Sequence, residues 1–401
     1  MSRLFARLIP AALLCYAASA SADTIDLDLT GALARARRDA RDAITARGRI
    51  AQAEAHVLGA GVVFVTNPEL EGGLGPRLTS THPLDAEARL SQALEPGRRG
   101  PRRQLARAER SLAESERDAT LRELDLEVSL AFYDALFTAE VAAQAKRAED
   151  FASAAAAAAQ RRRQAGEITD LDQNLARVAF ARARSATQVA EAERAAALGK
   201  LAVLVGAGPS DTVVVRGTLA PPAVPAQVAA ADRADVRTLA REGDVARAQL
   251  AQAVANGRPE LGLFVAYQRE DTDSIVVGGL SFTLPVWNRA EGDKAAARAR
   301  ERTAGEAHTA AVRIADRQLA DALAVYVTSQ QAVASFEKDA LPLLDDSEQL
   351  LQKTIDAGQI AISDYLVARQ EILSGRREYL ERRLALAKAA ITVRYVGGGQ
   401  P

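Results

Sequence analysis

The chain has 401 residues, of which 26% are charged and only 4% are aromatic, and its net charge is −1. This near-neutral balance gives no indication of a nucleic-acid partner or an anionic surface. The scarcity of large aromatic side chains argues against two or three compact globular domains and favours long helices that pack closely through alanine.

Residues 1–22 are predicted to be a secretory signal peptide. Arg3 and Arg7 form a basic start, an apolar stretch follows, and residues 20–22 (Ala-Ser-Ala) supply small side chains for cleavage. Cys15, the only cysteine, follows Leu14 rather than the small residue that lipidation requires, so it is interpreted as part of the signal core. The mature chain is therefore expected to be exported without a disulfide or a thiolate metal site.

Motifs in the first half of the chain return in the second half in the same order and at nearly the same spacing. Residues 68–70 read Pro-Glu-Leu, as do 259–261, and Ala-Gly-Glu-Ile at 165–168 returns as Ala-Gly-Gln-Ile at 357–360. A period of roughly 190 residues is too long for a solenoid repeat and predicts a duplicated unit. The predicted organisation is a first unit at 23–205, a linker at 206–233, a second unit at 234–396 and a tail at 397–401.

Each unit is predicted to consist mainly of very long helices. No proline occurs between Pro101 and Pro209 or between Pro285 and Pro342, and proline breaks helix interiors. A continuous helix over residues 102–164 would be about 95 Å long at the usual helical rise. That segment carries two apolar stripes, which predict a packed neighbour on each side, and the end of the chain shows the spacing of a coiled-coil seam. A plain amphipathic bundle is the alternative.

Two segments between the helices alternate apolar and polar residues with the period of a β-strand. They predict one hairpin within residues 68–95 and another within 259–285. The predicted strands are residues 68–79, 84–95, 259–270 and 275–285, with turns at 79–83 and 271–274. Their apolar face is expected to meet lipid through Leu74, Leu90, Leu263 and Leu280. A further short strand is predicted at the valine run 213–215, in the linker.

The four long strands have the length and alternation of transmembrane strands. No later run approaches the roughly 20 apolar residues of a spanning helix, so any membrane insertion is expected to use strands. Four strands cannot close a barrel, for which about eight is the practical minimum, and an open edge in lipid leaves backbone groups unpaired. The chain is therefore expected to form a trimer, which supplies about twelve strands.

Four short motifs carry a resemblance to a known family. They are residues 67–70 (Asn-Pro-Glu-Leu), 97–100 (Gly-Arg-Arg-Gly), 285–289 (Pro-Val-Trp-Asn-Arg) and 357–364 (Ala-Gly-Gln-Ile-Ala-Ile-Ser-Asp). With the duplication, they make the chain resemble the TolC family of outer-membrane efflux channels over nearly all of its mature length. The resemblance implies a mostly α fold with a small β part. The duplicated unit of long coiled-coil helices and two β-hairpins would assemble as a trimeric α-barrel with a twelve-strand transmembrane β-barrel.

The resemblance also implies a function and partners. The homotrimer would sit in outer-membrane lipid and extend into the periplasm, where it would receive substrates from an inner-membrane RND-type pump and a periplasmic adaptor, the membrane fusion protein. The short chain and the 67–70 motif look most like the branch that serves heavy-metal cation pumps of the cobalt-zinc-cadmium type. A type I secretion or drug-efflux channel of the same fold is the alternative. A periplasmic adaptor matches less well, because adaptors carry one helical hairpin flanked by compact β-domains.

The turns near residues 166 and 358, between the longest helices, are candidate adaptor contacts. Gly166 and Gly358 occupy these turns, and glycine accepts the left-handed conformation that ends a helix, so a structural role alone explains both. The resemblance implies that the turns, together with Arg163 and Ile360, form the periplasmic tip that meets the adaptor. The arginine run 161–163 is either part of this docking surface or a solvated helix face.

Asp172 and Asp364 each follow a turn glycine by six residues. Acids near helix starts commonly complement the helix dipole. The resemblance instead implies that Asp364, and with it Asp172, lines a narrow periplasmic aperture, where threefold symmetry creates a carboxylate ring that favours cations. Relatives with a described closed gate carry an arginine and a second acid where this chain has Ile360 and Val367. A salt-bridged closure is therefore not expected here.

No catalytic or metal site is expected. His56, His82 and His308 share no ligand-like spacing, and the only methionine is Met1, so the sequence offers no cluster of soft metal ligands. It contains neither a nucleophile motif nor a phosphate loop. The chain is predicted to be a passive conduit without a cofactor, and not an enzyme.

Overall fold

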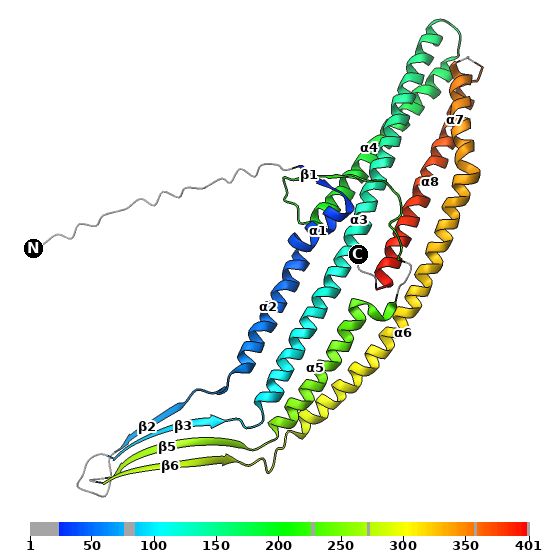
Figure 1. Ribbon diagram of the computed structural model, residues 1–401. Coiled ribbons are helices and arrows are strands. Elements are labelled where there is room, and N and C mark those ends of the chain that lie inside the picture. The colour runs from blue at the N-terminus through cyan, green and yellow to red at the C-terminus, as the bar shows by residue number, and fades with distance from the viewer. Residues whose placement is uncertain (1–23, 76–84, 226–228, 271–272, 357–358, 399–401) are drawn as a thin grey trace, which may run out of the picture.

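The computed structural model describes residues 24–75, 85–225, 229–270, 273–356 and 359–398. The predicted signal peptide, the predicted 79–83 turn and Gly358 lie outside these residues. The chain is a long bundle of helices with a four-stranded sheet at one end (Figure 1).

The order of elements is the same in the two halves of the chain. After the short helix α1 (Leu29–Asp39), the first half runs through α2 (Arg41–Gly61), β2 (Glu69–Gly75), β3 (Asp85–Leu94), α3 (Arg99–Gln164) and α4 (Asp170–Leu204). The second half runs through α5 (Ala234–Asn256), β5 (Glu260–Glu270), β6 (Asp273–Thr283), α6 (Glu291–Ser335), the π-helical turn η2 (Phe336–Ala340), α7 (Leu341–Asp356) and α8 (Ile362–Val396). This confirms the prediction of a mostly helical, duplicated fold with two β-hairpins.

The helix α3 runs without a break for 66 residues. It begins at Arg99, slightly earlier than predicted, because Pro101 falls in the first turn, where a backbone N–H has no helical partner to lose. Along its length α3 packs against α2, α4, α5 and α8. The two apolar stripes on this helix therefore serve neighbours on more than one side.

The long helix of the second half is interrupted once but does not end. Between α6 and α7 the backbone takes the wider π-helical turn η2. Pro342, the second residue of α7, has no N–H to offer the carbonyl of Lys338, and the wider turn absorbs this missing bond. Pro342 therefore changes the hydrogen-bond pattern of a helix that continues to Asp356.

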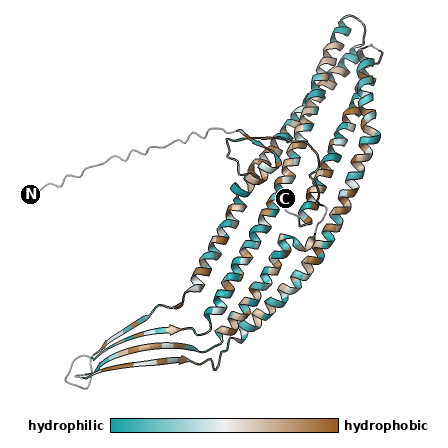
Figure 2. Ribbon diagram, viewed as in Figure 1, coloured by the Kyte–Doolittle hydropathy of each residue, from teal (hydrophilic) through white to brown (hydrophobic). Residues whose placement is uncertain are grey.

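The four long strands form one antiparallel sheet in the order β2-β3-β5-β6. Leu90 pairs with Leu70 on one side and with Val265 on the other. Directly paired residues share a face and side chains alternate along a strand, so the apolar residues of all four strands lie together. The residues proposed to face lipid are all on this face: Leu74, Leu90, Leu263 and Leu280. Figure 2 shows the alternation of hydrophobic and hydrophilic residues along the strands.

The predicted turn at 271–274 is wrong in its second half. Asp273 and Ser274 belong to β6, where they pair with Glu270 and Arg269. Polar residues at a solvated strand end can continue the ladder, and a hairpin needs only about two residues for its connection. The strand β6 therefore begins at Asp273, two residues before its predicted start at residue 275.

A second, smaller sheet lies beside the middle of the bundle. β1 (Thr24–Leu27) pairs in parallel with β4 (Thr212–Val215). The valine run predicted β4, whereas β1 was not predicted. Next to this sheet, the largest apolar cluster joins α1, α3, α4 and α8 through residues that include Ala36, Val128, Leu201 and Ala387. The alanines allow the helix backbones to approach closely at this level.

Candidate functional site

The tip, which we define as the end of the helical bundle opposite the sheet, holds the α3–α4 and α7–α8 turns (Figure 1). At the end of α3, Gly166 has a φ of 78°. The backbone N–H groups of Gly166 and Glu167 donate to the carbonyls of Arg163 and Arg162 at 3.0 and 2.9 Å. This left-handed helix ending is the structural role predicted for Gly166.

Two arginines of the 161–163 run are paired with acids of the same turn. Arg163 donates to both carboxylate oxygens of Asp170, at 2.5 and 3.1 Å, and Arg162 donates to Glu167 at 3.3 Å. The hydrogen bond that Arg163 donates holds the pKa of Asp170 below its ordinary value. These pairs brace the α3–α4 turn and offset part of the positive charge of the run.

Asp172 caps the start of α4. Its backbone N–H donates to Thr169 Oγ1 at 3.1 Å, and its carboxylate accepts from the Thr169 N–H at 3.2 Å and from the Thr169 hydroxyl at 2.8 Å. This reciprocal capping box satisfies backbone donors at the helix N-terminus. The structure therefore gives Asp172 a capping role at the start of α4.

Asp364 occupies the matching third position of α8 without the same cap. The residue before that helix is Ala361, which offers no side-chain hydrogen bond. Asp364 is exposed in the single chain and lies in the first turn of α8, at the tip. The two candidate aperture acids thus occupy equivalent positions but have different surroundings, and the capping box is present only at Asp172.

An apolar cluster joins the two hairpins at the tip. Ile360 is half-buried and packs against the cluster formed by Leu351, Tyr365 and Ile372. The Tyr365 ring stacks on Phe151 of α3 with 5.6 Å between ring centroids. Ile360, a candidate adaptor contact, therefore also contributes to the packing of the tip.

An ion cluster holds α7 against α8 just below this apolar cluster. Glu348 accepts hydrogen bonds from Arg369 at 2.6 Å and from Arg376 at 2.5 Å, and Arg376 also donates to Asp345 at 2.8 Å. Partial burial alone would raise the pKa of Glu348. The hydrogen bonds from the two arginines outweigh it and hold the pKa below the ordinary value of 4.5.

The Glu348 cluster predicts acid sensitivity of the tip. Because folding lowers the pKa of Glu348, the ion cluster stabilises the folded state above pH 4.5. This stabilisation is lost as the pH falls through the lower folded-state pKa of Glu348. Glu348→Gln is expected to cost about 1 kcal/mol at neutral pH, a modest value because the pair is partly solvated. Thermal unfolding followed by circular dichroism should show a weaker acid dependence in this variant. Glu306→Gln, at an exposed position of α6, is the control; equal pH profiles for wild type and Glu348→Gln would contradict the prediction.

An open groove of about 930 Å³ runs between α3, α4 and α8 near the tip. Its walls are mainly alanine and larger apolar side chains, with Arg182, Arg369 and Arg377 among them. Val367 lines this groove and is 71% exposed in the single chain. Val367 is therefore part of an uncovered, mainly apolar surface in the single chain.

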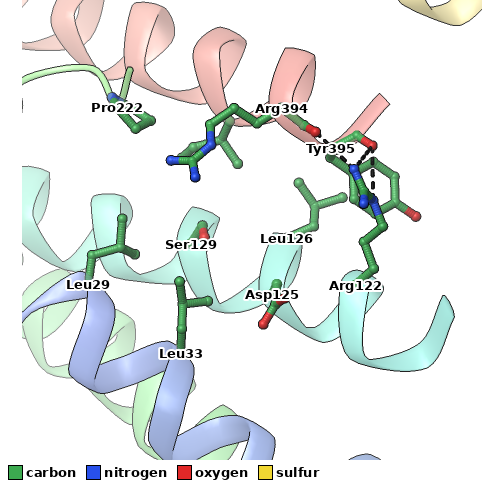
Figure 3. A pocket seen from close by; sticks show the side chains of 10 residues that line it. Leu29, Leu33, Arg122, Asp125, Leu126, Ser129, Pro222, Arg394 and Tyr395 are labelled. Carbon is green, nitrogen blue, oxygen red and sulfur yellow. Dashed lines mark hydrogen bonds between the residues drawn. The ribbon is translucent and has the colours of Figure 1, made fainter. Parts of the chain in front are cut away.

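A small pocket of about 50 Å³ lies at mid-bundle between α1, α3 and α8 (Figure 3). Arg122 closes one end by donating to the backbone carbonyls of Arg394 and Tyr395 at 3.0 and 2.9 Å. The carboxylate of Asp125, which also lines the pocket, accepts two hydrogen bonds from Arg37, at 2.9 and 2.6 Å. The polar groups of the pocket thus serve the packing of α1 and α8 on α3, and its volume suits little more than water.

The described residues contain no group of three or more His, Cys, Asp or Glu side chains placed to hold a metal ion. His82 lies outside them. None of the helices in the described part of the chain combines the length and the apolar character that a bilayer crossing requires.

No protein-family model matches the chain, and no curated protein matches it at a significant level. Solved structures do match. CusC, described in terms of transmembrane channel formation, has a TM-score of 0.77 at 17% identity over 94% of each chain. The CmeC outer membrane channel of Campylobacter jejuni gives 0.78 at 15% identity over 92% of this chain and 86% of that chain. The open-state MtrE outer membrane channel of Neisseria gonorrhoeae gives 0.76 at 18% identity, over 92% and 89%.

The chain has the fold of outer-membrane channels. The long-helix and β-hairpin fold expected from the four motifs is thereby confirmed, because the matches cover most of this chain and most of each matched chain.

Part of the site was not predicted. The Thr169–Asp172 cap did have a sequence signal, a threonine three residues before an acid. The Glu348 cluster had none, because its partners lie on different helices.

Proposed function

We propose that the chain is one subunit of a homotrimeric outer-membrane efflux channel that extends into the periplasm and conducts its substrate passively. The observation that carries this proposal is the sheet at the end of the helical body. Its edge strands β2 and β6 have no further partner within the described residues. In lipid such edges would be costly, and β2 of one copy can pair with β6 of the next to close a twelve-strand barrel.

Apolar surface on the helices supports the same assembly. In the single chain, large apolar side chains are exposed along the outer helices, on α4, α6 and α7. They include Leu171, Val178, Val189, Ile314, Val325, Leu343 and Leu350. Neighbouring copies would cover such residues in a closed ring of helices.

Cross-linking between the two edge strands tests the trimer. The only cysteine lies in the predicted signal peptide, so introduced cysteines would be the only thiols of the mature chain. Glu71→Cys combined with Val277→Cys, treated with a bifunctional thiol reagent in outer membranes, is expected to give covalent dimers and trimers. Arg89→Cys with Ala266→Cys is the matched control, because these residues pair within one chain and should give only monomers. An uncross-linked edge pair together with a monomeric mass in detergent would refute the trimer.

The proposed cargo is a heavy-metal cation, and the 67–70 motif is the feature that favours it. The proposed conduction path ends at the tip, where Asp364 from three copies would form the aperture ring. Asp172 is the secondary candidate. The same turns, with Gly166, Gly358, Arg163 and Ile360, are the proposed contact with the adaptor that links the channel to an inner-membrane RND-type pump.

Neutralising Asp364 is expected to weaken cation preference. Closely spaced carboxylates attract counter-cations, so in planar bilayers Asp364→Asn should shift the reversal potential toward zero and weaken block by divalent cations, while conductance persists. Asp172→Asn is the comparison and should have the smaller effect on selectivity. Unchanged reversal potential and unchanged divalent block in Asp364→Asn would assign this residue to the helix end alone.

A further inference from the structure

The junctions between the strands and the helices carry four exposed arginines, which we call the arginine collar: Arg99, Arg103, Arg258 and Arg289. Within the part of the chain that the structure describes, three of them donate only to backbone carbonyls. Arg99 Nη2 lies 2.8 Å from the Gly61 oxygen, Arg258 Nη1 lies 3.2 Å from the Gly97 oxygen, and Arg289 Nε lies 3.4 Å from the Pro285 oxygen. A carbonyl orients a guanidinium but leaves its positive charge uncompensated.

Nearby acids do not neutralise the collar. Glu95 and Glu260 are taken by two other arginines, Arg102 and Arg98. Glu291 and Asp293, in the first turn of α6, form no ion pair with the collar among the described residues. The junctions therefore carry excess positive charge on a surface that is open in the single chain.

The same contacts show that the collar belongs to one level of the molecule. Arg99, at the start of α3, reaches the end of α2 through Gly61, and Arg258, after the end of α5, packs against Gly97. The carbonyl of Arg289 lies against Gly257. The ends of α2, α3, α5 and α6 lie side by side where the strands begin (Figure 1).

Large apolar side chains are exposed beside these arginines. The connection from α2 to β2 exposes Val62, Val63, Phe64 and Val65, and the connection from β6 to α6 exposes Leu284, Val286 and Trp287. Trp287, the only tryptophan of the chain, is 95% exposed. Tryptophan beside arginine is typical of residues at a membrane–water interface, where the ring is partly desolvated and the cation meets headgroups.

We propose that the arginine collar binds the headgroups of anionic phospholipids in the leaflet nearest the helices, while Trp287 and residues 62–65 enter the boundary with the acyl chains. This inference rests on the proposed membrane placement of the strands. Guanidinium groups match the geometry of phosphate oxygens, and the apolar neighbours select a phosphate attached to a lipid over a free one. The collar would fix the depth at which the helical body meets the membrane.

Trp287 supplies a direct readout. The purified full-length protein in an uncharged detergent would be titrated with short-chain phosphatidylglycerol, with short-chain phosphatidylcholine, and with inorganic phosphate. Phosphatidylglycerol is expected to shift Trp287 emission to the blue and to raise the thermal midpoint. A triple variant, Arg99→Gln with Arg258→Gln and Arg289→Gln, should require at least about tenfold more of this lipid for the same shift.

Two further variants make the test specific. Lysine at the same three positions keeps the charge and should retain most of the response. Glutamine at Arg177, Arg184 and Arg194, exposed arginines of α4 remote from the strands, should leave it unchanged. The proposal would be overturned if the triple glutamine variant of the collar gave the same Trp287 emission shift as the wild type. It would also be overturned if phosphatidylcholine and phosphatidylglycerol gave equal shifts. A full response to inorganic phosphate would replace the lipid by a free anion.

Trimer mass and bilayer conductance of the same samples separate this inference from the proposed function. A conducting trimer without a specific response to phosphatidylglycerol refutes the collar and leaves the channel proposal intact. A chain that neither trimerises nor conducts refutes the channel, and the collar with it.

Discussion

Replacing Leu280 by arginine is expected to destabilise the membrane-inserted trimer by about 2–4 kcal/mol, the cost of a cation on a lipid-facing strand near the bilayer centre. Leu280 lies in the interior of β6 and pairs with Leu263, on the sheet face that is apolar in all four strands. The protein would be unfolded with urea from phosphatidylcholine vesicles, and the free energy of unfolding would be compared with that of the wild type.

Ser281→Arg is the matched control for this substitution. Ser281 is the next residue of the same strand, so it lies at nearly the same depth but on the opposite face. Its arginine should cost much less, because in a closed barrel the face opposite the lipid face would line the water-filled lumen. If Ser281→Arg proves the more damaging of the two, the assignment of the sheet faces is inverted.

Replacing Arg37 by methionine is expected to lower the free energy of unfolding by about 3 kcal/mol, because it leaves the buried carboxylate of Asp125 without its partner. Asp125 is only 7% exposed, and both of its oxygens accept hydrogen bonds from Arg37. The reverse change, Asp125→Asn, should cost less, about 1–2 kcal/mol, since the Arg37 side chain is 41% exposed and can turn to water. Urea unfolding of each variant measures this asymmetry.

Arg38→Met supplies the control for Arg37. Arg38 is the next residue of α1, but its ion pair with Asp39 lies at the surface, with 69% of the arginine side chain exposed. Such a pair contributes at most about 1 kcal/mol. Equal losses for Arg37→Met and Arg38→Met would show that the buried pair is no more important than a surface one.

The sequence predicted the elements whose signal is periodic. Proline-free intervals located the long helices, and period-2 alternation located all four strands and the face that carries Leu280. Such patterns follow from backbone geometry, which acts over a few residues. The limits of the elements were less certain, because a hydrogen-bond ladder can continue into polar residues, as it does at Asp273, and because Pro342 changes a helix without ending it.

The contacts that fix the helices against one another were not predictable in the same way. Arg37 meets Asp125 across 88 residues of chain, and Glu348 of α7 meets Arg369 of α8 across 21 residues that include the connection between these helices. No local pattern records such pairs. In a sequence with 26% charged residues, many arginines and acids are equally plausible partners until the helices are placed. The Thr169–Asp172 cap is the exception, because its two members are close in sequence.

The parallel pairing of β1 with β4 has a consequence for the order of assembly. A growing chain emerges N-terminus first, so Thr24 and its neighbours appear long before Thr212, their partner almost half a chain later. This sheet has to close late, and a contact between residues so distant in sequence slows folding. Until it closes, β1 has no sheet partner among the described residues. The residues of β1 are thus made early but reach their final place late.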